Sequence, residues 1–284
     1  MLKTGWKGAT VKKISSKENP IFKYLISLTR PQLARKQQRV LAEGLRLCRD
    51  LILSNVTIEQ IIVSDHGLTH PDIKCFLASI PGVSGRPMPQ TINLTDPLMK
   101  KLSQTKNTQG IAMVCLSPIL DQPADPPDKG GLYLIADQVQ DPGNLGTMIR
   151  TADAFDFAAV ILIEGTVWPM NDKVMRASMG SVFHLPLISF PRLADAVRWL
   201  SQAHIPVIAA DLDGDSCLDT AVPCPAALLI SNEANGLSEA ARQLADHLVS
   251  IPMPGMAESL NAAAAAAILS YEMMRLNKQR SVLS

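Results

Sequence analysis

The stretch "GLYLIADQVQDPGNLGTMIRTADAF", residues 131–155, joins an apolar strand pattern to an amphipathic helix pattern. Residues 131–136 are almost continuously apolar, which is typical of a strand that is buried on both faces. Pro142 and Gly143 predict a turn, and the helical pattern starts there. Strand-to-helix units of this kind build parallel sheets, and ligands bind beyond the carboxyl ends of the strands. We therefore look for chemistry in the loops that follow the strands.

The remainder of the second half repeats this alternation. Five further strand patterns are "AAVILIE", "HLPLIS", "PVIAAD", "AALLIS" and "LVSIPM", at 158–164, 184–189, 206–211, 226–231 and 248–253. Helices are expected after Asn171, Pro191, Leu237 and Ser259. Regular alternation of strands and helices predicts an α/β fold, in which a mostly parallel C-terminal sheet carries helices on both faces.

The first half predicts a smaller α/β domain. Strand patterns at 39–44, 58–64 and 110–117 alternate with helical ones. A proline-rich segment then separates the halves and indicates a linker. The predicted domains are residues 1–119 and 131–284, and the linker is 120–130.

The charges of the chain are distributed unevenly. The net charge is +1, but residues 1–120 carry +10 and residues 121–284 carry −9. A basic half suggests contact with a polyanion, although a solvated basic face is the alternative. The block "RPQLARKQQR" at 30–39 supplies four cations, and we expect these to contact RNA phosphates. The predicted RNA-binding residues are Arg30, Arg35, Lys36 and Arg39.

Several other classes of protein are disfavoured. Five cysteines without a C-x-x-C spacing argue against a disulfide framework or a zinc cluster, and they favour the reducing cytoplasm. No apolar run is long enough for a membrane span, and the N-terminus has no apolar core of a signal peptide. His66 with His70, and the segment 211–216, lack the ligand sets of metal sites. We expect no metal.

Polar residues gather in three of the predicted loops. The first loop contains Asn144 and Arg150, the second contains Glu233 directly after a strand, and the third contains Ser259 and Asn261 before an alanine-rich helix. Each has a plain structural alternative: a tight turn with a surface arginine, a glutamate that stabilises the next helix, and a serine that caps the last helix. One loop alone does not decide between these interpretations.

Taken together, the three loops resemble the three motifs of the SpoU/TrmH-type RNA 2′-O-ribose methyltransferases of the SPOUT superfamily. The matching segments are "DPGNLGTMIRTA", "NEANGLS" and "IPMPGMAESLNAAAAAAI". The segment 169–187 is similar to the region between the first two motifs. "VLAEGLRLCRDLI" and "QGIAMVCLSP" are similar to the small substrate-binding domain of the family. The resemblance covers nearly the whole chain, and it is most specific in the three motifs.

This resemblance implies a fold and a cofactor. The C-terminal sheet would end in a deep trefoil knot, preceded by a small ribosomal-protein-like α/β domain. The protein would be a homodimer that binds S-adenosyl-L-methionine in the knot, with the active site near the dimer interface. The cofactor-binding residues implied are Ser231, Ile251, Met253 and Leu260. Ser231 stands where the family usually has glycine, and we expect this small side chain to be tolerated.

The resemblance also implies catalytic roles for Asn144, Arg150, Glu233, Ser259 and Asn261. A guanidinium normally stays protonated, so Arg150 is expected to hold a phosphate and stabilise charge on the 2′-oxygen rather than act as a base. Glu233 would accept a proton or hold Arg150. The two asparagines would orient the ribose and the loops, and Ser259 would form hydrogen bonds within the site.

Three alternatives remain open at this point. The chain could be a non-catalytic RNA-binding or ribosome-assembly protein with the same fold, a transfer-RNA 2′-O-methyltransferase, or a metabolic α/β enzyme. The basic first half has no role in a metabolic enzyme. The two-domain layout favours ribosomal RNA over transfer RNA as the substrate.

Overall fold

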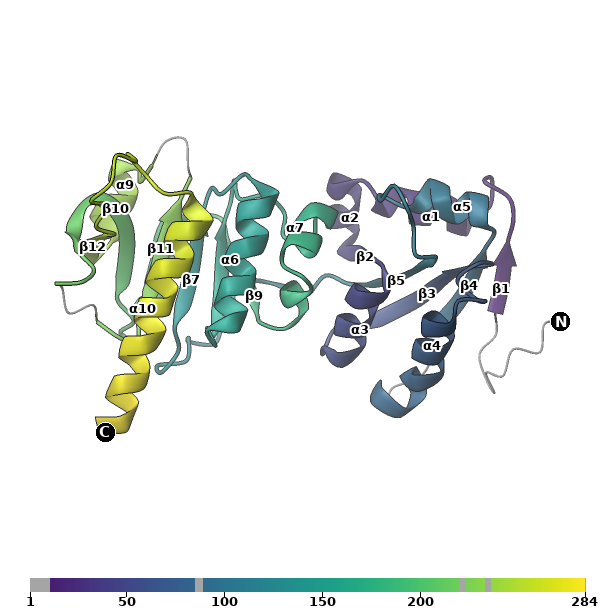
Figure 1. Cartoon of the computed structure of the whole chain (residues 1–284), viewed down its shortest axis with the longest axis horizontal. Coiled ribbons are helices and arrows are strands. Elements are labelled where there is room, and N and C mark those ends of the chain that lie inside the picture. Colours follow the sequence, from purple (N-terminus) through teal and green to yellow (C-terminus); the bar gives the residue numbers. More distant parts are fainter. Residues whose placement is uncertain (1–10, 85–88, 220–222, 233–235, 284) are drawn as a thin grey trace. The chain divides into compact units, whose positions relative to one another are not determined.

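The computed structural model describes residues 11–84, 89–219, 223–232 and 236–283 (Figure 1). The chain divides into two compact units, residues 1–118 and 119–284, and each unit has its own sheet. In the described part of the chain, no helix is both long and apolar enough to cross a membrane.

The first unit is a five-stranded mixed sheet with helices between its strands. Across the sheet the strands are β1 (Val11–Ile14), β4 (Gln90–Leu94), β3 (Ile58–Ser64), β5 (Ile111–Leu116) and β2 (Arg39–Glu43). β1, β4 and β3 are parallel, whereas β5 is antiparallel to both of its neighbours. The helices are α1 (Pro20–Leu28), α2 (Pro31–Gln37), α3 (Leu45–Leu53), α4 (Pro71–Ser84) and α5 (Asp96–Leu102).

Some elements of this unit follow from the sequence and others do not. The three strand patterns form β2, β3 and β5, whereas β1, β4 and α2 were not expected. β4 lacks an apolar pattern because it contains two polar residues, Thr91 and Asn93, which are nevertheless buried. The Asn93 amide donates to the Val63 carbonyl at 3.2 Å, which satisfies part of its hydrogen-bonding capacity inside the core.

The second unit is a seven-stranded sheet in which every neighbouring pair is parallel. This confirms the predicted parallel α/β fold. Across the sheet the strands are β12 (His247–Ser250), β10 (Val207–Ser216), β11 (Ala227–Ser231), β7 (Tyr133–Asp137), β8 (Ala159–Ile163), β9 (Leu187–Phe190) and β6 (Ile119–Asp121). The helices are α6 (Pro142–Ala154), α7 (Asp172–Ala177), the 3-10 turn η1 (Ser181–Phe183), α8 (Leu193–Ser201), α9 (Glu239–Leu244) and α10 (Ala262–Leu283).

Helices cover the sheet of the second unit, and its central strands are buried along their whole length. One face packs on α8, whose Trp199 lies edge-on to Tyr133 with ring centroids 5.8 Å apart. On the other face, α6 and α10 lie side by side (Figure 1). α7 also packs closely on α6, because Gly146 has no side chain there: a Cβ at Gly146 would lie 2.5 Å from the Cβ of Ala177.

The predicted linker belongs structurally to the second unit. Residues 119–121 form β6, which pairs with β9 at the edge of the sheet. Further along, the indole of Trp199 donates to the carbonyl of Asp125 at 2.8 Å, and the hydroxyl of Tyr133 donates to that of Asp128 at 3.2 Å. These contacts hold in place a proline-rich segment that its composition alone indicates to be flexible.

The strand order determines where the loops meet. After β9 the chain returns across the sheet to β10, and β11 then inserts between β10 and β7. The carboxyl ends of β7, β10, β11 and β12 therefore lie at the same edge of the sheet. Loops that are more than 100 residues apart in the chain can meet at this edge, as Asn144 and Asn261 do.

Candidate active site

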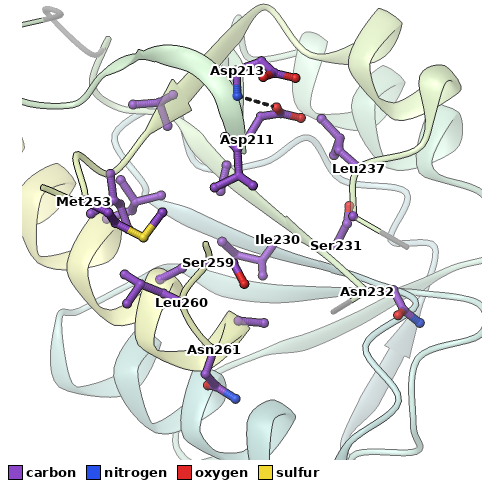
Figure 2. A pocket seen from close by; sticks show the side chains of 18 of the residues that line it. Asp211, Asp213, Ile230, Ser231, Asn232, Leu237, Met253, Ser259, Leu260 and Asn261 are labelled. Carbon is purple, nitrogen blue, oxygen red and sulfur yellow. Dashed lines mark hydrogen bonds between the residues drawn. The ribbon is translucent and has the colours of Figure 1, made fainter. Parts of the chain in front are cut away.

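A cavity of about 610 Å³ lies at the carboxyl ends of β10, β11 and β12 (Figure 2). The described residues that line it are 210–213, 230–232, 236–237, Arg242, Val249, Ile251, Met253, 259–262, Ala265 and Leu269. All four residues predicted to bind a cofactor are among them, as are Ser259 and Asn261. The structure therefore brings the second and third loops to one cavity.

The wall of the cavity is apolar over much of its area. Figure 2 shows Met253 and Leu260 across the cavity from Leu237. Ile230, at the end of β11, is buried beneath it. Residues 251–260 have their backbone in neither helix nor strand, so sheet or helix ladders do not use their N–H and C=O groups. Such a wall suits an apolar ring held by main-chain hydrogen bonds.

An ion-pair cluster forms another part of the wall. Arg242 of α9 contacts the carboxylate of Asp211 at 2.8 Å and that of Asp213 at 3.5 Å. The side chain of Asp211 is 4% exposed, whereas that of Asp213 is 81% exposed. From the sequence, the segment 211–216 is considered only as a calcium loop, and its place in the cavity is not predicted. The available signal was its position, directly after an apolar strand pattern.

Two hydrogen bonds join the three loops. The Asn261 amide donates to Asn144 Oδ1 at 2.9 Å, which links the third loop to the start of α6. The Asn232 amide donates to the Gln138 carbonyl at 3.0 Å, which links the second loop to the segment after β7. Three segments that are far apart in sequence are therefore fastened together at the edge of the sheet.

Asn261 also caps α10. Its Oδ1 accepts from the backbone N–H of Ala263 at 2.9 Å and of Ala264 at 3.3 Å. The serine-cap alternative for the third loop is therefore wrong, because Asn261 occupies the cap position and Ser259 lies on the cavity wall. One asparagine thus orients the helix and ties it to α6.

Arg150 lies apart from the cavity of its own chain. It is exposed on α6, about 9 Å further along the helix than Asn144 at ~1.5 Å per residue. It does not line the cavity, and its side chain forms no hydrogen bond or ion pair with the described residues. Glu233 lies outside the described residues.

A buried carboxyl near the cavity was not identified from the sequence. Asp137 ends β7 and is only 7% exposed. Burial raises the pKa of its carboxyl, and the nearby Ser231 hydroxyl partly opposes this change. The signal was an aspartate that directly follows a buried strand. No group of three or more acidic, histidine or cysteine side chains in the described part of the chain could hold a metal.

The predicted RNA-binding residues lie in the first unit, on or beside α2. Arg30, Arg35 and Lys36, which we call the α2 cluster, are exposed and form no ion pair with other described residues. Arg39 differs, because it is partly buried and contacts Glu59 at 2.7 Å. The hydrogen bond that Arg39 donates to Glu59 raises the pKa of this arginine. Three of the four cations are therefore available to a polyanion.

Two family models match the chain. Residues 131–271 match the model described as the SpoU rRNA Methylase family. Residues 19–113 match the model described as the MRM3-like substrate binding domain. The two matches fall within the second and the first unit, respectively.

Relatives with known names and structures are similar over nearly the whole chain. The 23S rRNA (guanosine(2553)-2′-O)-methyltransferase RlmP of Bacillus subtilis is 31% identical over 264 residues, covering 93% of this chain and 99% of that protein. The crystal structure of an AdoMet-bound rRNA methyltransferase from Sinorhizobium meliloti has a TM-score of 0.80 at 29% identity, covering 93% and 98% of the two chains. The SpoU methyltransferase AviRb from Streptomyces viridochromogenes, in complex with AdoMet, has a TM-score of 0.80 at 27% identity, with the same coverage.

Proposed function

The chain belongs to the SpoU rRNA methylase family, and from this premise we propose that it methylates a ribose 2′-hydroxyl of ribosomal RNA with S-adenosylmethionine as the methyl donor. The observation that carries the proposal is the convergence of the second and third loops on one cavity, with the first loop fastened to them by the bonds of Asn261 and Asn232. The names of the relatives favour ribosomal over transfer RNA.

The residues around the cavity fit S-adenosylmethionine. A volume of about 610 Å³ is in the range of small-molecule sites, and apolar side chains such as Ile230 and Met253 suit an adenine ring. The main-chain groups at Ser231, Ile251 and Leu260 would hold the cofactor, with Met253 beside it. When bound, the cofactor supplies an electrophilic methyl group, so the protein must position the ribose hydroxyl and accommodate its proton.

We assign the positioning of the ribose to the asparagines and the charge to Arg150. Asn144 and Asn261 share a hydrogen bond at the edge of the cavity and hold the first and third loops at a fixed separation. Arg150 is exposed and would bind the phosphate beside the target ribose and stabilise negative charge on its 2′-oxygen. Ser259 would add a hydrogen bond from the cavity wall. Glu233 remains a candidate proton acceptor.

A second copy of the chain would complete this site. Arg150 lies outside the cavity of its own chain, on the face where α6 packs beside α10. Ile268 and Tyr271 of α10 are 44% and 51% exposed on successive turns, and Met256 in the third loop is fully exposed. Large exposed apolar side chains that gather on neighbouring elements mark interaction surfaces. We propose that a homodimer covers them and brings Arg150 to the cavity of its partner.

We also propose that the second unit is knotted. The insertion of β11 between β10 and β7, followed by the return of the chain along α10, supports this. Cys224 contacts the Met273 carbonyl of α10 through its Sγ at 3.6 Å, so the segment before β11 lies against the last helix. A trefoil crossing here would hold the cavity loops without disulfides, since none of the five cysteines forms one. Thiols that stay reduced agree with the cytoplasmic location that we predict.

The first unit is proposed to bind the RNA substrate, with the α2 cluster as its phosphate-contacting surface. The match to a substrate-binding model and the exposure of these three cations support this role. We assign residues 1–119 to a ribosomal-protein-like substrate-binding domain and 131–284 to the methyltransferase domain. The predicted linker, 120–130, contains the last two residues of β6 and leads into the methyltransferase domain.

The test is methyl transfer from labelled S-adenosylmethionine to ribosomal RNA, with protected 2′-oxygens mapped afterwards. We expect a single protected site for the wild-type chain and loss of transfer for Arg150→Ala, with the dimer intact by sedimentation. Arg198→Ala, an exposed arginine on α8, is the matched control and should transfer normally. Normal turnover by Arg150→Ala would refute the role of this residue, and transfer to a base would refute the reaction.

A further inference from the structure

The carboxyl of Asp137 is buried at the end of β7, where the roles assigned above leave it unused. Its residue is 7% exposed, and within the described residues no cation contacts it. Placing a carboxylate out of water without a cation opposes its ionisation, in agreement with its raised pKa. A buried acid in this position therefore costs stability at neutral pH.

Asp137 is one side chain away from the cavity. In the parallel pairing of β11 with β7, Ser231 is its direct cross-strand partner, and Ser231 lines the cavity. Ser231 Oγ is buried and makes no hydrogen bond of standard geometry to described residues, yet it lies close enough to influence the Asp137 carboxyl. The adjacent bond from Asn232 to Gln138 fixes the two strand ends together.

We propose that Asp137 determines specificity for the cationic methyl donor, with its carboxylate acting as a buried counter-charge behind the Ser231 wall. The inference rests on the proposed function, since it takes the cavity to bind S-adenosylmethionine. The donor carries a positive sulfonium, whereas the demethylated product, S-adenosylhomocysteine, carries a neutral thioether there. A nearby negative charge favours the donor over the product, and its effect is strongest where water is excluded.

The two aspartates on the described wall are less suited to this role. Asp211 is already neutralised by Arg242 at 2.8 Å. The side chain of Asp213 is 81% exposed, so water and salt screen its charge. Asp137 combines burial with the absence of a cation among the described residues, and these are the conditions under which one charge discriminates between two otherwise similar ligands.

The experiment measures affinities of the full-length protein by titration calorimetry for three ligands. These are S-adenosylmethionine, S-adenosylhomocysteine and sinefungin, in which an ammonium group replaces the methylsulfonium. For Asp137→Asn, which keeps the shape and removes the charge, we expect the affinity for both cationic ligands to fall about tenfold and that for the neutral product to change less than about twofold. Asp156→Asn is the matched control: this aspartate is exposed after α6 and does not line the cavity, so all three affinities should change less than about twofold.

Equal changes for all three ligands in Asp137→Asn would mean a purely structural role and would overturn the proposal, as would no change for any. Should this variant not fold, Asp137→Ser is measured in its place, with the same expected difference between cationic and neutral ligands. If the wild-type protein binds none of the three, the proposed function fails rather than this inference.

Discussion

Replacement of Asn261 tests whether the three loops form one unit. This side chain makes three hydrogen bonds: its Oδ1 accepts from the N–H groups of Ala263 and Ala264, and its amide donates to Asn144 at 2.9 Å. The first two cap α10, and the third joins α10 to α6. Asn261→Ala removes both functions. Asn261→Ser keeps a capping oxygen but is too short to reach Asn144.

The expected magnitudes follow from these contacts. Loss of an N-cap costs ~1 kcal/mol, and loss of an exposed hydrogen bond between side chains costs ~0.5–1 kcal/mol. Asn261→Ala should therefore lower the free energy of unfolding of the second unit by about 1.5–2 kcal/mol, and Asn261→Ser by about 0.5–1 kcal/mol. In a unit of this size the alanine variant should melt roughly 3–8 °C lower.

The assay is urea and thermal unfolding followed by circular dichroism, with S-adenosylmethionine affinity measured in parallel. Both variants should bind the cofactor more weakly than the wild type, because the third loop is no longer held to the first. Equal stabilities of the alanine and serine variants would show that Asn261 contributes no cap. Unchanged cofactor affinity in both would show that the link to Asn144 does not shape the cavity.

Three further predictions concern packing, pH and salt. Gly146→Ala should destabilise the protein by ~1–3 kcal/mol, because the added Cβ would lie 2.5 Å from the Cβ of Ala177 on α7. The control is Thr147→Ala, on the exposed side of α6, which should change the stability by less than about 0.5 kcal/mol. Because burial raises the pKa of Asp137 in the folded state, protonation of this carboxyl stabilises the fold. That contribution is fully present below the ordinary aspartate pKa of about 3.9, and it is lost as the pH rises through the raised value. Without ligand, Asp137→Asn should therefore gain stability relative to the wild type as the pH rises above about 4. A stability difference in urea unfolding that stays constant with pH would contradict this. Neutralising the α2 cluster should weaken RNA binding and reduce the slope of log K against log salt by up to ~0.9 per lost phosphate contact, whereas Arg39→Gln should reduce it less, because Arg39 is paired with Glu59.

The sequence predicts the fold class and the location of the chemistry for a local physical reason. Each buried parallel strand must be a short apolar run, and each such run in the second half became a strand, from 133–137 to 247–250. Because ligands bind beyond the carboxyl ends of such strands, the loops containing Asn144, Ser231 and Asn261 could be selected before the structure was considered. Where local pattern and burial disagree, the prediction fails: Thr91 and Asn93 are polar but lie in a core strand.

Only the tertiary structure decided which residues meet. No periodicity places β11 between β10 and β7, and it is this order that makes Ser231 the neighbour of Asp137. Residues 119–121, at the start of the proline-rich segment, became a strand because β9 offered them an unpaired edge. Arg150, which sequence motifs group with the cavity residues, lies on the outer surface of a helix. Burial, pairing and shared hydrogen bonds depend on contacts between residues far apart in the chain, and a linear pattern carries no information about those distances.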